Sequence, residues 1–92
     1  RKWMYKNCRE ELLAVMRAYV MEIGENAFTR QEAIKAMERN GSKYTAGSVS
    51  AHLSYRCCAN IPRYYKPTYD DYEKLGGGLY KVINWTTEIT TE

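Results

Sequence analysis

Residues 72–83 read YEKLGGGLYKVI, with three consecutive glycines between two short runs of strand-forming residues. Glycine adopts the left-handed backbone angles of a tight turn at no steric cost, so the pattern predicts a β-hairpin with strands at 72–75 and 79–83. Two pairs compete for the buried face of the second strand, Tyr80 with Val82 and Leu79 with Ile83. A C-terminal hairpin is therefore one part of the expected fold.

A first helix is predicted upstream, over Cys8–Ile23, because apolar residues recur there on one helical face. Asn7, with a glutamate three residues later, has the spacing of a capping box at its start. Gly24 is placed to take the left-handed conformation that ends a helix. We expect Glu11, Arg17 and Glu22 on the solvent side of this helix.

Two further helices are predicted between the first helix and the hairpin. The second begins at Arg30 behind a Thr29 cap, runs for about ten residues and ends at the Asn-Gly pair at 40–41. The third spans residues 46–59 behind a Thr45 cap, with apolar side chains four residues apart at Val49, Leu53 and Cys57. The chain is thus expected to place three helices before the hairpin.

Charge is distributed unevenly along the chain, although the net charge of +3 is modest. Residues 39–69 contain five cations and five tyrosines but no Asp or Glu. Cations and phenols together contact phosphates, sugars and bases, so this window favours a nucleic-acid partner. The alternative is that the tyrosines serve as core and hairpin residues and that the window lacks acids by chance.

The face of the third helix opposite its apolar stripe is small and polar. Its members are Gly47, Ser48, Ala51, Ser54, Tyr55 and Cys58. Small side chains let another backbone approach closely, whereas an ordinary solvated face carries Lys and Glu. We therefore expect this face to lie against a ligand.

Residues 28–83 resemble the small winged-helix domains of bacterial and archaeal DNA-binding proteins. The resemblance rests on the order helix, short strand at Phe28, helix, turn, helix and glycine-tipped hairpin, and on the segments FTRQEAIKAM, TAGSVSAHLSYRCCAN and YEKLGGGLYKV. It implies an α+β winged helix-turn-helix fold, three helices followed by a C-terminal β-hairpin wing. It also implies double-stranded DNA binding with the third helix in the major groove, as a transcription regulator or the DNA-recognition module of a larger DNA-acting protein.

The resemblance, taken with the charge pattern, suggests which residues contact DNA. Ser48, Ala51, Ser54 and Tyr55 would face the bases. Further contacts, mainly to phosphates, would come from Lys43, Tyr44, Thr45, Arg56, Arg63, Tyr64 and Lys66, together with the basic loop 61–69 and the wing. No Arg, Asn or Gln of the helix is placed for bidentate readout of a base, so we expect low sequence specificity.

Neither catalysis nor a metal site is expected, and no cofactor is implied. His52, Cys57 and Cys58 point about 100° or more apart on a helical wheel, so no two of them chelate a metal from one helix. The single histidine has no evident Asp or Ser partner. Asp70 and Asp71 are interpreted as part of a solvated loop that caps the hairpin.

We expect one domain over residues 1–92, with an N-terminal extension at 1–6 and a flexible tail at 86–92. Three aromatic residues lie outside the expected core: Trp3, Tyr5 and Trp85. They either complete the core against the first helix or form a homodimer interface or a contact with a fused or partner domain. A protein-interaction winged helix is therefore the alternative function.

The cellular location is predicted from what the chain lacks. Its longest apolar run, residues 12–16, is far shorter than the roughly 20 residues that cross a bilayer, so no membrane association is expected. Three cysteines without a secretory segment favour a reducing compartment. We expect a cytoplasmic, nucleoid-associated protein, or a nuclear one in a eukaryote.

Overall fold

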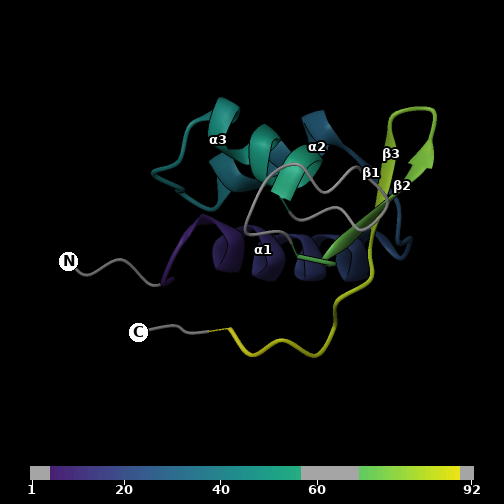
Figure 1. Ribbon diagram of the computed structural model, residues 1–92, viewed down its shortest axis with the longest axis horizontal. Helices are drawn as coiled ribbons and strands as arrows, with labels where there is room; N and C mark the ends of the chain where they lie inside the picture. The colour runs from purple at the N-terminus through teal and green to yellow at the C-terminus, as the bar shows by residue number, and fades with distance from the viewer. Residues whose placement is uncertain (1–4, 57–68, 90–92) are drawn as a thin grey trace.

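The computed structural model describes residues 5–56 and 69–89 (Figure 1). The helices are α1 (Cys8–Ile23), α2 (Arg30–Arg39) and α3 (Ala46–Ala51), and α3 continues as the π-helical segment η1 (His52–Arg56). The strands are β1 (Phe28–Thr29), β2 (Tyr72–Gly76) and β3 (Leu79–Val82). The predicted fold class is confirmed: the protein is α+β, with three helices followed by a C-terminal hairpin.

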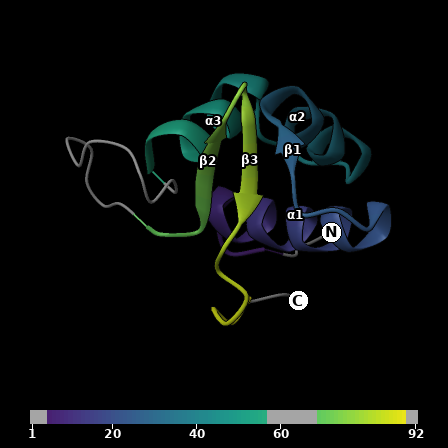
Figure 2. The same cartoon turned by 90° about the vertical axis from the view of Figure 1, so that its right-hand side faces the viewer.

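The three strands form one antiparallel sheet in the order β1-β3-β2. Figure 2 shows the strands side by side in front of the helices. Phe28 of β1 pairs with Tyr80 of β3, and its buried ring lies 6.1 Å from the ring of Tyr80 and 6.0 Å from that of Tyr72. The short strand β1 thus joins the segment between α1 and α2 to the hairpin.

The core lies between the inner face of the sheet and the helices. The inner face is formed by Tyr80 and Val82 of β3, which are buried, whereas Leu79 and Ile83 are exposed. This settles the choice that alternation left open. The helices contribute Leu12, Leu13, Met16, Val20, Ala33, Ala36, Met37, Val49 and Leu53. Cys8 also lies in the core, and burial raises the pKa of its thiol to about 11, so the group stays protonated at neutral pH.

The helix ends follow the predicted signals. The Asn7 side chain accepts a hydrogen bond from the Glu10 amide, and Gly24 ends α1 with a φ of 74°. Thr29 and Glu32 form a complete capping box at the start of α2, with both bonds present. A polar side chain that accepts from the first-turn amides supplies the partner that a helix start otherwise lacks.

The capping box makes a pH-dependent contribution to stability. Hydrogen bonds from the Tyr19 hydroxyl and then from the Thr29 amide lower the pKa of Glu32 from its ordinary value of 4.5. Because the folded state favours the carboxylate, its contribution is present above pH 4.5 and is lost as the pH falls through the lowered pKa. We expect wild type to lose stability on acidification relative to Glu32→Gln, which does not titrate. Parallel urea melts of both proteins between pH 7 and pH 3 measure this difference, and parallel loss in both would contradict it.

The third helix differs from its prediction. The α-helix ends at Ala51 instead of continuing to 59, and its last described turn is π-helical. Val49 and Leu53 are buried as predicted, whereas Cys57 lies outside the described residues. A π turn holds more residues than an α turn, so each residue advances less around the axis. Residues after Ala51 therefore point toward directions that an α-helical wheel does not predict.

Two arginines of α1 tie both ends of the hairpin to this helix. Arg9 donates two hydrogen bonds to Asp71, at 2.8 and 3.0 Å, and its guanidinium lies over the Tyr69 ring. Arg17 donates to the carbonyls of Asn84 and Thr87, at 3.0 and 3.1 Å. The prediction that Asp71 is solvated is wrong, because it is fully buried. The expected solvent position of Arg17 is also wrong, because its guanidinium binds this C-terminal segment. The segment includes Thr87, which lies in the expected flexible tail.

Candidate nucleic-acid interface

The start of α3 is held in place by a buried carboxylate. Glu11 of α1 is fully buried, which contradicts its predicted solvent position. It accepts a hydrogen bond from the Asn40 side-chain amide at 2.9 Å and another from the Ser42 hydroxyl at 3.1 Å. Ser42 in turn accepts from the Tyr44 amide. The turn between α2 and α3 is therefore fixed to α1 through three consecutive bonds.

The predicted contact residues ahead of α3 have different environments. Lys43 and Thr45 are exposed, and the Lys43 ammonium lies 5.5 Å from the centre of the Tyr44 ring. Tyr44 is half-buried and packs against the core, so only part of this side chain remains for a ligand. Thr45 caps α3 by accepting from the Ser48 amide. The surface at the helix start therefore offers one cation and one hydroxyl.

On α3 itself, Ser48 and Ala51 are half-exposed, and Gly47 is exposed between them and the cap. The Thr45 hydroxyl also donates to the Ser48 hydroxyl, at 3.4 Å. We call the set Lys43, Thr45, Gly47, Ser48 and Ala51 the α3 surface. Its members carry no carboxylate, and the structure brings them together along one side of the helix start.

Ser54 does not belong to this surface, so its predicted role in contacting bases is wrong. It is 5% exposed, and its hydroxyl lies 3.2 Å from the Tyr80 hydroxyl inside the core. The wider π turn brings Ser54 to the core side, where the sheet supplies its hydrogen-bond partner. Tyr55 and Arg56 follow it in η1. Arg63, Tyr64 and Lys66, with Cys57, Cys58 and Trp3, lie outside the described residues.

The hairpin tip lies on the same side of the molecule as α3, and α1 lies on the opposite side (Figures 1 and 2). The three glycines of the tip all have positive φ angles, and a Cβ at any of them would meet nothing within 4 Å. Lys81 pairs with Glu73 at 3.4 Å on the exposed face of the hairpin. The tip is thus a bare backbone turn, free to approach a surface that α3 also touches.

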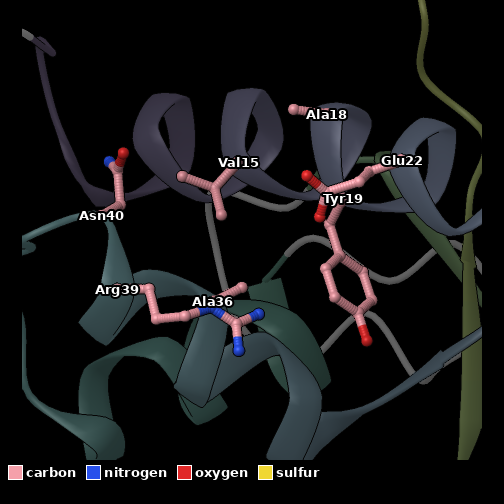
Figure 3. Close-up of a pocket in the computed structure, with 7 residues that line it drawn as sticks. All are labelled: Val15, Ala18, Tyr19, Glu22, Ala36, Arg39 and Asn40. Atoms are coloured by element: carbon pink, nitrogen blue, oxygen red, sulfur yellow. The ribbon is translucent and has the colours of Figure 1, made fainter.

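A shallow groove of about 260 Å³ lies between α1 and α2, away from the α3 surface. Its lining comprises Val15, Ala18, Tyr19, Glu22, Ala36, Arg39 and Asn40. Figure 3 shows the Tyr19 ring and the Arg39 side chain entering the space between the two helices. The Tyr19 hydroxyl donates to Glu32, and this bond raises the pKa of Tyr19. Within residues 5–56 and 69–89, no group of three or more His, Cys, Asp or Glu could hold a metal.

A protein-family model described as a domain of unknown function (DUF7669) matches residues 12–82, well over half of the chain. The chain belongs to this family. The DUF7669 match begins within α1 and ends with β3, so it includes Glu11's neighbours, the α3 surface and the whole hairpin. No curated protein and no solved structure matches the chain. The family description names no activity, and a shared fold does not by itself fix a function.

Proposed function

We propose that the protein binds double-stranded DNA as a winged helix-turn-helix domain. The α3 surface would enter the major groove, and the hairpin would rest on the flanking backbone. The observation that carries the proposal is the α3 surface itself, which is small, polar and free of carboxylates and begins with the exposed Lys43. In the sequence, these residues belong to the acid-free window at 39–69, which contains five cations.

The side chains of this surface suit close approach better than tight base selection. Gly47 and Ala51 add little bulk, so the helix backbone can come near base edges. The hydroxyls of Thr45 and Ser48 both donate and accept, and therefore pair with several base edges. We expect binding with modest intrinsic specificity, in a transcription regulator or in the DNA-recognition module of a larger protein.

The affinity for DNA is expected to depend strongly on salt. Four or five cations of the window, each neutralising one phosphate, give a slope of log affinity against log salt of about −4 to −5. Fluorescence anisotropy with a labelled random duplex at five salt concentrations measures the slope. A flat response would contradict the proposal. Equal affinities for DNA and for an unrelated polyanion such as heparin, compared at equal charge, would also contradict it.

The second candidate function is a protein-interaction surface. It is favoured by Trp85 and Ile83, which are 45% and 38% exposed just after β3. Tyr5 is half-buried. Sedimentation at rising protein concentration, without DNA, separates the two functions: association supports this candidate, and a monomer that binds duplex DNA supports the first. Within the described ranges, no helix is long and apolar enough to cross a membrane.

A further inference from the structure

We infer that His52 selects a base through a ring nitrogen whose hydrogen-bonding character is set by the fold. The inference rests on the proposed DNA-binding function and adds a residue that discriminates between bases. His52 follows Ala51 as the C-cap of α3, one helical turn after Ser48, and it is half-buried. It was not among the contact residues expected from the sequence.

The tautomer of His52 follows from its hydrogen bond. Its Nδ1 lies 3.0 Å from the backbone carbonyl oxygen of Ser48. A carbonyl oxygen only accepts, so Nδ1 carries the proton, and in the neutral ring Nε2 is left with its lone pair. In the part of the chain that the structure describes, no other group hydrogen-bonds this ring. The bond thus presents Nε2 as an acceptor.

An acceptor at a fixed place distinguishes two classes of base in the major groove. Adenine and cytosine present an amino group there, which donates, whereas guanine and thymine present carbonyl oxygens, which accept. Nε2 of the neutral ring pairs with an amino group and leaves a carbonyl opposite it without a donor. The nearby hydroxyls of Thr45 and Ser48 adapt to either class, so they do not blur this preference. One position of the contacted strand should therefore prefer adenine or cytosine.

The test compares wild type with two variants in a selection from a random duplex library, sequenced after one round of binding at pH 8. Wild type should prefer adenine or cytosine over guanine or thymine at one position by about three- to tenfold, the factor expected for one hydrogen bond. His52→Ala should reduce that ratio to near one at that position only. His52→Lys, which places a donor there, should reverse it toward guanine or thymine.

The selection tests the role of His52 and the proposed DNA binding separately. Retention of the wild-type preference in His52→Ala would overturn the inference while leaving DNA binding in place. Failure of wild type to enrich or retain any duplex at low salt would instead overturn the proposed function. Gln31→Ala, an exposed substitution on α2, is the matched control and should keep the wild-type preference. Circular dichroism of the variants checks that α3 remains folded.

Discussion

Replacement of Asp71 with alanine is expected to lower the free energy of unfolding by about 3–5 kcal/mol, because it breaks a largely buried ion pair with Arg9. Asp71 is fully buried and accepts from Arg9 at 2.8 and 3.0 Å and from the Asn84 side chain at 2.7 Å. Its backbone carbonyl also accepts from the Ile83 amide, which stays in the variant. The loss is therefore one of side-chain contacts between α1 and the two ends of the hairpin.

Urea denaturation followed by circular dichroism measures this loss. Glu73→Ala is the matched control, because it removes the same charge from the same strand region but breaks only the exposed pair with Lys81. An exposed ion pair contributes at most about 1 kcal/mol, so the control should remain close to wild type. Equal losses of unfolding free energy in the two variants would show that the buried pair stabilises the fold no more than the exposed pair does.

Replacement of Phe28 with alanine is expected to cost a similar amount, about 3–5 kcal/mol, for a different reason. The ring is fully buried and packs against the rings of Tyr72 and Tyr80, and its removal leaves a cavity that the sheet cannot fill without moving. Because β1 has only two residues, its pairing with β3 should also weaken in this variant.

Thermal melts and amide hydrogen exchange test this second expectation. Leu79→Ala, on the exposed side of the neighbouring strand, is the control and should shift the melting temperature little. Exchange of the β3 amides should rise in Phe28→Ala and stay near wild type in Leu79→Ala. A Phe28→Ala protein with unchanged β3 protection would contradict the role assigned to this ring.

Local signals in the sequence were sufficient for most of the fold. The caps at Asn7, Thr29 and Thr45 and the left-handed Gly24 act within one or two turns of chain, so their spacing alone predicts the helix starts and the end of α1. The glycine triplet predicts the hairpin turn for the same reason. Each of these features depends on residues that are close together in the sequence, so a local pattern is enough to predict it.

The errors concern polar groups whose partners are distant in sequence. Glu11 is solvated on a helical wheel, but its partner Ser42 lies 31 residues away, and the partner of Arg9, Asp71, lies 62 residues away. No local pattern encodes such pairs. One sequence signal could have indicated that Glu11 is buried. It precedes two consecutive leucines, at 12 and 13, and therefore lies at the edge of the core face of the helix.

The sequence predicted only part of the candidate site, because the helical wheel applies only to the α-helical turns of α3. Thr45, Ser48 and Ala51 lie on the surface because they precede the change from α to π geometry, so the α-helical wheel holds for them. Ser54 follows that change, and a hydroxyl contact with Tyr80, 26 residues away, keeps it inside. The role proposed for His52 rests on the bond between its Nδ1 and the Ser48 carbonyl, which a helical wheel does not reveal.

A map of the backbone amides that shift when a short duplex is added to nitrogen-15-labelled protein tests the DNA-binding account most directly. The account predicts that the largest shifts fall on Thr45, Ser48, Ala51 and His52, with smaller ones at the hairpin tip and almost none along α1. The largest shifts along α1 or on the exposed face of β3, with the start of α3 unchanged, would contradict it.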